Sequence, residues 1–324
     1  MLSFSIVINT YNRGDLLVRT LESFRWLKYG GEFEVIVVNG PSTDNTAAIL
    51  ADWDSEIRIG KCPVANISVS RNIGICMARG DIVAFIDDDA VPEPEWLSHL
   101  ASAYDSDRIG GAGGIVYDHT GCNVQYQYLT ADRLGNVNWK AEGSSEHLCA
   151  LGSFEFPYLQ GTNASFRRYA LLEIGGSDEE FEYYLDETEV CCRLVDAGYI
   201  VRQLPGAPVH HKVAPSSLRD EQKITRDRYP SLKNKLYFSL KHARDNYSVD
   251  QILEDYERFR VASEEDMEYH IAGGRLSPDA RVSFRRDAER ARKDGLERGM
   301  SGNAELITPR KLQKYQGSFH RFTP

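Results

Sequence analysis

The stretch VAFIDDDAVPEPEWL, residues 83–97, decides how the rest of the chain is interpreted. An apolar run ends in three consecutive carboxylates, Asp87, Asp88 and Asp89, and a turn marked by Pro92 follows. Two like charges about 4 Å apart repel by roughly 1 kcal/mol in water and by several times that near a protein surface. A solvated turn would accommodate such a run, but a strand end has no need of three adjacent acids.

Short apolar, β-branched runs alternate with amphipathic patterns along the first half of the chain. The runs at 5–8, 34–38 and 82–86 predict buried strands. The segments between them predict helices, one beginning near residues 42–44 and another over 70–79. This alternation predicts an α/β fold with a mostly parallel, doubly wound sheet. The glycine-rich segment 110–114 is compatible with either a strand or a loop.

A polar cluster follows each of these apolar runs: NTYNR at 9–13, NGPS at 39–42 and the acids at 87–89. Ligands of open α/β sheets bind at the carboxyl ends of the strands, so we expect the three clusters to meet at one rim. Asp87 and Asp89 are two residues apart and would face the same side of an extended chain. Such oxygen ligands suit Mg²⁺ or Mn²⁺.

Further candidates for the same chemistry lie outside the strand ends. Arg71 near the start of a predicted helix is placed to reach a phosphate. In the acidic segment 184–194, Glu189 and Arg193 have the spacing of a helical ion pair, which leaves Asp186 or Glu187 as a general base. Either His210 or His211, which follow a predicted strand, would complete a carboxylate-bound metal site.

Composition limits the classes of partner. The 324 residues carry a formal net charge of −10, which argues against a nucleic-acid-binding protein. No run approaches the roughly 18 apolar residues of a membrane span. The six cysteines form no CxxC pair and are expected to be reduced, so we expect a cytoplasmic protein.

The character of the sequence changes after Pro215. We therefore predict a catalytic domain over 1–217, with a nucleotide-binding half at about 1–110 and an acceptor half at about 111–217. Helical patterns at 232–247, 250–268 and 278–298 predict a helical C-terminal extension over 218–324. A homo-oligomer formed through these helices is one possible role for the extension.

Taken together, these segments resemble the family-2 glycosyltransferases of the GT-A fold, in particular soluble, non-processive bacterial members. The resemblance covers about residues 3–217 and rests on segments that occur in the family's order and spacing: SIVINTYNR, EVIVVNGPSTDNT, SRNIGICMARGDIVAFIDDD, GTNASFRR, GGSDEEFEYYLDETEVCCRL and VHHKVAPSS. The QxxRW motif and the transmembrane helices of the processive, membrane-bound synthases of this family are not found in the sequence.

The resemblance implies a role for each candidate residue. A nucleotide pocket would be lined by Thr10, Tyr11, Arg13 and Asn39, with Arg71 and Asn72 beside the diphosphate and ribose. In the DxD motif, Asp89 would bind the metal together with Asp87, and Asp88 would lie near the ribose or the metal. The loop beside the transferred sugar would contain Gly161, Thr162 and Asn163. Glu187 would be the catalytic base and His211 the histidine near the metal, with Asp186 and His210 as the alternatives.

Two positions depart from the family pattern. Members that read uracil often have two acids after the second strand, where this chain has Asn39 and Gly40. The sequence therefore does not identify the nucleobase of the donor, and UDP-, dTDP- and GDP-linked sugars are all compatible with it. The acid pair is also reversed, Asp186-Glu187 in place of Glu-Asp.

These features predict an inverting, metal-dependent enzyme that moves a sugar from a nucleotide-diphosphate donor to a hydroxyl group of a glycan, a lipid-linked sugar or a protein. One alternative is a non-catalytic nucleotide-sugar-binding or scaffold protein of the same fold, although both acid clusters are intact. A sugar nucleotidyltransferase is less compatible, because residues 9–14 lack the glycine-rich loop of that class.

Overall fold

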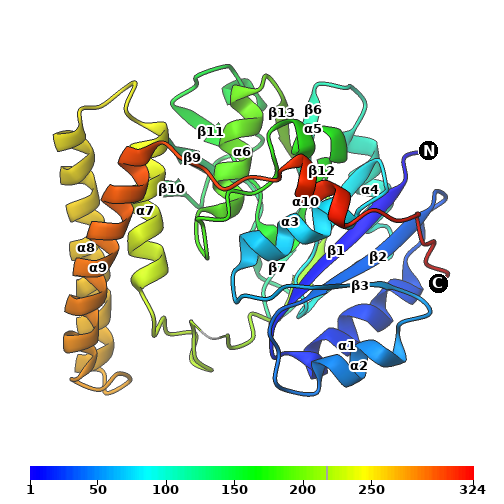
Figure 1. Ribbon diagram of the computed structural model, residues 1–324, viewed down its shortest axis with the longest axis horizontal. Helices are drawn as coiled ribbons and strands as arrows, with labels where there is room; N and C mark the ends of the chain where they lie inside the picture. The colour runs from blue at the N-terminus through cyan, green and yellow to red at the C-terminus, as the bar shows by residue number, and fades with distance from the viewer. Residues whose placement is uncertain (217) are drawn as a thin grey trace.

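The computed structural model describes residues 1–216 and 218–324, so the predicted domain boundary at Ser217 lies outside the described residues. Its central element is a seven-stranded sheet with the order β13-β6-β12-β4-β1-β2-β3 (Figure 1). Only β12 runs antiparallel to its neighbours, so the predicted, mostly parallel α/β sheet is confirmed. The strands are β1 (Phe4–Thr10), β2 (Phe33–Asn39), β3 (Arg58–Lys61), β4 (Ile82–Phe85), β6 (Ile109–Gly113), β12 (Ala164–Arg167) and β13 (Ile200–Gln203).

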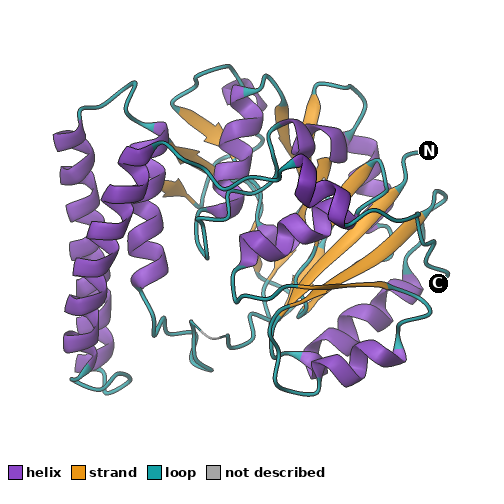
Figure 2. Ribbon diagram, in the orientation of Figure 1, coloured by secondary structure: helices purple, strands orange, loops and turns teal. Residues whose placement is uncertain are grey.

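Helices cover both faces of this sheet (Figure 2). Alternate residues of β1 face opposite sides: Ile6 and Ile8 belong to one buried cluster, whereas Val7 belongs to the other. One face is covered by α1 (Gly14–Ser23), α2 (Thr46–Asp52) and α4 (Trp96–Ala103), and the other by α3 (Ile67–Met77), α5 (Arg168–Glu173) and α6 (Asp186–Asp196). This is the two-sided covering of a doubly wound sheet.

Two helices begin at other residues than the sequence predicts. The helix expected from residues 42–44 begins at Thr46, and Asp44 accepts a hydrogen bond from the backbone N–H of Thr46 at 3.1 Å. The helix expected from Ser70 begins at Ile67, where the side chain of Asn66 accepts from the backbone N–H of Val69 at 3.0 Å. Arg71 therefore lies in the second turn of α3 and not at its N-terminus.

Close packing places α3 against the sheet. A Cβ atom added to Gly74 would lie 2.4 Å from Cγ1 of Val7, so the helix can approach β1 this closely only with glycine there. The same approach brings the first turns of α3 beside the carboxyl end of β1.

Two small sheets complete the sheet-containing part of the molecule. The glycine-rich segment 110–114 forms most of strand β6, which settles the choice between strand and loop. One small sheet has the order β5-β14-β7-β8 and the other β10-β9-β11. Their strands are β5 (Ala90–Pro92), β7 (Val116–Tyr117), β8 (Val124–Tyr126), β9 (Thr130–Asp132), β10 (Val137–Asn138), β11 (Glu155–Pro157) and β14 (Val209–His211).

The C-terminal third is helical, as predicted, but it is closely joined to the sheet-containing part. Its helices are α7 (Tyr229–His242), α8 (Val249–Ala272), α9 (Ala280–Ser301) and α10 (Pro309–Lys314). Tyr237 and Phe238 of α7 belong to the same buried cluster as Leu185 and Val190. In the part of the chain that the structure describes, none of the helices combines the length and apolarity required to cross a membrane.

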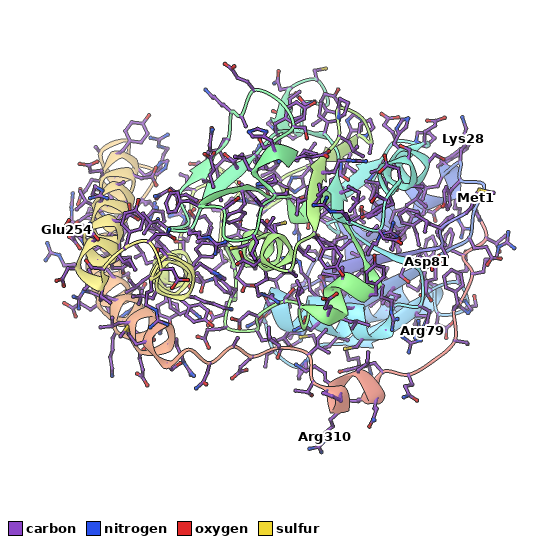
Figure 3. All side chains as sticks on the ribbon, turned by 90° about the horizontal axis from the view of Figure 1, so that it is seen from above. Met1, Lys28, Arg79, Asp81, Glu254 and Arg310 are labelled. Carbon is purple, nitrogen blue, oxygen red and sulfur yellow. The ribbon has the colours of Figure 1, made fainter. Side chains whose placement is uncertain are left out.

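After α9 the chain returns across the face that carries α3, a course that the sequence did not predict (Figure 1). Arg79 donates to the carbonyls of Tyr315 and Gly317 at 2.8 and 2.7 Å, and Figure 3 shows this residue beside the returning segment. Phe322 then stacks on Phe33 with ring centroids 5.6 Å apart. The division into two domains stays a prediction.

A buried lysine provides a test of how tightly the helical region is attached. Lys235 of α7 is fully buried, pairs with Asp255 of α8 at 2.8 Å and donates to Asn136 of the sheet-containing part at 2.7 Å. Burial lowers the pKa of Lys235, and the contact with Asp255 opposes that shift. Lys235→Ala should lower the free energy of unfolding in urea by about 3–5 kcal/mol, because the buried Asp255 then keeps only the exposed Arg258, at 3.1 Å, as a charged partner.

The matched control is Lys28→Ala, which breaks an exposed pair with Glu95 (3.4 Å; Lys28 is labelled in Figure 3). This substitution should cost less than about 1 kcal/mol. Equal losses in the two variants would contradict the tight attachment of α7.

Candidate active site

The three polar clusters meet at the carboxyl edge of the sheet, as the sequence predicted. The hydroxyl of Thr10, at the end of β1, donates to Asp88 at 2.8 Å. The backbone N–H of Gly40, after β2, donates to the carbonyl of Thr10 at 2.8 Å. Asn9 donates to Ser70 of α3 at 2.6 Å, which adds the first turns of this helix to the same rim.

Two of the three aspartates form a compact cluster with His211. Each of Asp87, Asp89 and His211 offers one ligand atom, and these three atoms all lie within 4.8 Å of one another. Nε2 of His211 is 3.4 Å from Oδ1 of Asp89 and 3.6 Å from Oδ2 of Asp87. The other ring nitrogen of His211 contacts Gln125 at 3.0 Å, which fixes the orientation of the ring.

This cluster fits a divalent cation. Among the described residues, Oδ1 of Asp89 has no hydrogen-bond partner although it is buried, and it faces the other two ligand groups. Two carboxylates and an imidazole are suitable ligands for Mn²⁺, and the carboxylates also suit Mg²⁺.

His210 does not belong to the cluster, so its assignment as an alternative metal ligand is corrected. Both histidines lie within β14, where neighbouring side chains point to opposite faces. Nε2 of His210 contacts Glu93 at 2.7 Å, and its ring stacks on Tyr117 at 5.3 Å.

Arg13 offsets part of the charge of the triplet. Its guanidinium lies 3.0 Å from Asp88 and 2.8 Å from Asp89. Burial raises the pKa of Asp88 to about 7, against the opposing effect of Arg13. Burial would also raise the pKa of Asp89, but the hydrogen bond and charge of His211, together with Arg13, lower it to about 2. Asp89 is therefore the more strongly ionised of these two acids.

The acid pair at the start of α6 faces the triplet across a shared cavity. Asp186 forms an ion pair with Arg71 and is buried, whereas Glu187 lies 3.7 Å from Arg71 and keeps 19% of its side chain exposed. The guanidinium of Arg71 lies between the two acids and lines the cavity, and its expected contact with a phosphate stays a prediction. A side chain at Gly161 would displace the end of this arginine, because its Cβ atom would meet the guanidinium.

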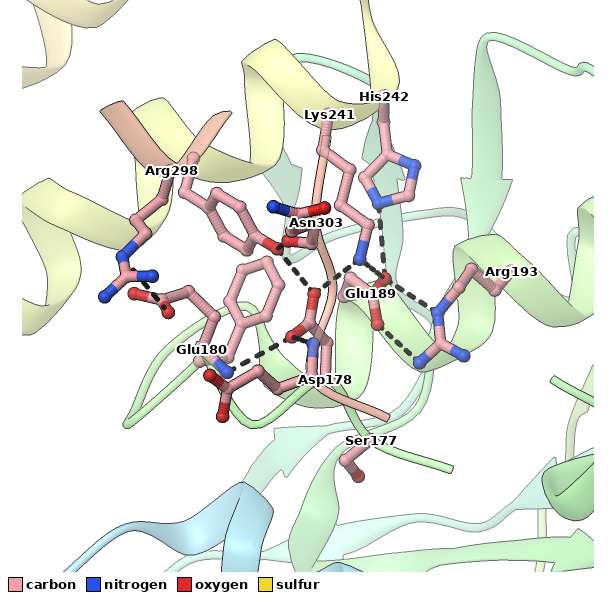
Figure 4. A network of polar contacts seen from close by, with 12 residues as sticks. Ser177, Asp178, Glu180, Glu189, Arg193, Lys241, His242, Arg298 and Asn303 are labelled. Atoms are coloured by element: carbon pink, nitrogen blue, oxygen red, sulfur yellow. Dashed lines mark hydrogen bonds and ion pairs between the residues drawn. The ribbon is translucent and has the colours of Figure 1, made fainter. Parts of the chain in front are cut away.

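A buried ionic network fixes α6 against α7 (Figure 4). Glu189 pairs with Arg193 at 2.7 Å, as its spacing predicted, and also with Lys241 of α7 at 2.7 Å. Burial alone would raise the pKa of Glu189, but the charges of Arg193 and Lys241 lower it well below its usual value. Lys241 also reaches Asp178 at 2.6 Å, so one residue of α7 holds both ends of the segment that carries the acid pair.

The turn that leads into the acid pair is strained. Tyr184 and Leu185 have φ angles of 73° and 63°, which side-chain-bearing residues rarely adopt. Asn234 of α7 donates to the carbonyls of both Tyr183 and Tyr184, at 2.6 and 3.1 Å. The helical region thus stabilises the backbone conformation that places Glu187. No local pattern in the sequence indicates these roles of Asn234 and Lys241.

Two adjoining cavities open on the rim. One, of about 400 Å³, is lined on the sheet side by Thr10, Tyr11, Arg13, Gly40 and Ser70. Its other wall includes Asp227, Tyr229 and Arg290 from the C-terminal region, which sequence reasoning missed.

The second cavity, of about 290 Å³, contains both acid clusters. It is lined by Asp87, Asp88, His211, Asp186, Glu187, Gly161 and Thr162, among others. The hydroxyl of Thr162 donates to Asp87, which links the loop at 161–163 to the metal-type cluster.

Two asparagines expected beside the donor are structural instead. Asn72 is fully buried and bonds to the backbone of Ser177 in both directions at 2.8 Å, and also to Glu179. Asn163 accepts from Trp96 and donates to the carbonyls of Ile115 and Ala207. Neither amide is free to contact a nucleotide sugar.

Asn39 lies at the predicted strand end but is turned toward its own loop. Its side-chain oxygen accepts from the hydroxyl of Ser42 at 2.7 Å, and Gly40, not Asn39, lines the larger cavity. Asn39 therefore shapes the loop beside the cavity.

Comparison of whole chains places this fold among known proteins. The structure superposes on a mannosyltransferase from Pyrobaculum calidifontis, solved in complex with GDP-Man and Mn²⁺, with a TM-score of 0.55. The two are 15% identical, and the match covers 92% of this chain and 86% of the other. At this identity the likeness establishes the GT-A fold alone.

Two sequence relatives are named as a polysaccharide synthase and a glycosyltransferase. The chain is 28% identical over 239 residues to a chondroitin synthase of Escherichia coli, a match that covers 65% of this chain and 35% of the relative. It is 29% identical over 222 residues to the glucosyl-dolichyl phosphate glucuronosyltransferase of Haloferax volcanii, covering 64% and 69%. This chain thus spans only about a third of the length of the chondroitin synthase.

The family model for glycosyl transferase family 2 matches residues 5–175, more than half of the 324 residues. The matched range contains β1, β2, β4 and the acidic triplet, which form the rim described above. The chain therefore belongs to glycosyl transferase family 2 and has the GT-A fold.

Proposed function

We propose that this enzyme transfers a sugar from a nucleoside-diphosphate donor to a hydroxyl group in a single, inverting displacement that depends on Mn²⁺ or Mg²⁺. The observation that carries the proposal is that Asp87, His211 and Glu187 line one cavity, with Asp89 completing the metal-type cluster. The complex of the related fold with GDP-Man and Mn²⁺ supports the same combination of ligands. The proposal does not specify the sugar or the nucleobase, and it includes UDP-, dTDP- and GDP-linked donors.

The larger cavity is suited to the nucleotide. Tyr11 is 36% exposed there, and Thr10 and Ser70 provide polar groups around it. Sugar transfer would occur in the neighbouring cavity, because the aspartate cluster lies where the two cavities share Arg13 and Asp88. A cation bound by Asp87, Asp89 and His211 would supply Lewis-acid stabilisation of the leaving diphosphate.

Glu187 is the better candidate for the base. Asp186 is neutralised by its ion pair with Arg71, whereas Glu187 is more exposed and farther from that guanidinium. Its carboxylate would accept the proton of the acceptor hydroxyl while the new C1–O bond forms and the bond from C1 to the phosphate oxygen breaks. Attack from the face opposite the leaving group inverts the anomeric carbon.

Glu187→Gln should lower the transfer rate by about 10²–10⁴-fold and leave donor affinity unchanged, because only proton acceptance is lost. The measurements are the turnover of nucleotide sugar with acceptor and calorimetric titration with the donor. Asp186→Asn is the companion variant. A Glu187→Gln enzyme with near-full turnover, alongside an inactive Asp186→Asn enzyme, would show that Asp186 is the base.

The neighbouring histidine, His210, provides a control for the assignment of the metal ligands. Asp89→Asn and His211→Ala should each weaken Mn²⁺ binding by at least about tenfold, since even the outer partners of metal ligands contribute that much. His210→Ala removes the adjacent histidine, which pairs with Glu93 instead, and should bind Mn²⁺ normally. Calorimetric titration with MnCl₂ in the presence of nucleoside diphosphate measures all three. Equal losses in His210→Ala and His211→Ala would contradict the assignment.

A further inference from the structure

An aromatic wall lies on the side of the transfer cavity formed by the small sheets. It consists of Tyr126 at the end of β8, Trp139 directly after β10 and Tyr158 directly after β11. The ring of Trp139 is 5.5 Å from that of Tyr126 and 6.5 Å from that of Tyr158, measured between centroids. All three line the cavity that contains Glu187.

Trp139 differs from its two neighbours in exposure. Tyr158 is 2% exposed, whereas Trp139 is 47% exposed. Packing alone accounts for the burial of Tyr158, which Trp139 meets edge-on. Packing does not account for the exposure of Trp139, because burial of the rest of its ring would be favourable.

The aromatic wall is close enough to Glu187 to serve the same reaction. Burial raises the pKa of Tyr126 and of Tyr158, and the negative charge of Glu187 adds to both shifts. The base therefore lies within electrostatic range of the rings. A molecule resting on Trp139 would therefore occupy the same cavity as Glu187 and could present a hydroxyl group to its carboxylate.

The surroundings of the ring define the class of molecule that fits. Gln125 and Gln160 line the cavity beside the rings and provide amide donors and acceptors. A flat apolar ring flanked by amides suits a molecule with one C–H-rich face and a rim of hydroxyl groups, which is the surface of a pyranose. An acyl chain would instead require a continuous apolar groove, and the acids of this cavity interrupt one.

We propose that the acceptor is a saccharide and that one of its rings stacks on Trp139 while a hydroxyl group of the same saccharide reaches Glu187. This inference rests on the proposed function and narrows its acceptor, so a failure of one must be distinguishable from a failure of the other.

The binding experiment does not depend on catalysis. Tryptophan fluorescence is recorded during titration with free oligosaccharides of neutral hexoses, N-acetylhexosamines and uronic acids. The matched control is Trp26, an exposed tryptophan (75%) that does not line the cavity. At least one oligosaccharide should change the emission of the wild type and of Trp26→Phe, but not that of Trp139→Phe. If no oligosaccharide changes the emission, or if Trp139→Phe responds as the wild type does, the inference is overturned.

The kinetic experiment separates positioning from folding. With a responding oligosaccharide as acceptor, Trp139→Ala should raise the acceptor KM by about tenfold and Trp139→Phe by less, because phenylalanine retains part of the stacking surface. Both variants should still hydrolyse the donor in the absence of acceptor, which would show that they are folded. A wild-type acceptor KM in Trp139→Ala, or transfer to serine- and threonine-containing peptides in preference to oligosaccharides, would overturn the saccharide assignment. Absence of donor turnover in the wild type would count against the proposed function instead.

Discussion

The concentration of carboxylates at one rim of the sheet is the constraint on which the rest of the site depends. Each of the more buried acids is compensated by neighbouring groups. Arg13 contacts both Asp88 and Asp89, His211 and the backbone N–H of Ala214 contact Asp89, and Arg71 contacts Asp186. Asp87 and Glu187 keep larger exposed fractions, 38% and 19% of their side chains. The compensation thus leaves one acid on each side of the cavity accessible to a substrate.

The helical C-terminal region takes part in this arrangement. Lys241 pairs with Glu189 and Asp178, and Asn234 holds the strained turn before Glu187 (Figure 4 shows the ionic part of these contacts). Tyr229 and Arg290 form part of the wall of the larger cavity, and the guanidinium of Arg290 lies 3.5 Å above the Tyr229 ring. The wall of the larger cavity and the turn before Glu187 therefore both include contacts with residues beyond 217.

The strands and the acid clusters could be predicted from the sequence because they depend on local pattern. Short β-branched runs form strands, and the parallel order brings their carboxyl ends together. The roles of Asn72 and Asn163 could not be predicted, since an amide that binds a ligand and one that binds a distant carbonyl look alike in sequence. Likewise, the distinction between His210 and His211 required the register of β14, and the return of the chain to Phe33 has no local signal.

The most direct test of the account is calorimetric titration of the wild-type enzyme with UDP-, dTDP- and GDP-linked sugars, with Mn²⁺ and again with excess chelator. The account predicts that at least one nucleotide sugar binds in the presence of Mn²⁺ and that chelation weakens this binding by at least about tenfold. Binding of the same nucleotide sugar with equal affinity in both conditions, or no binding of any of them, would contradict the account.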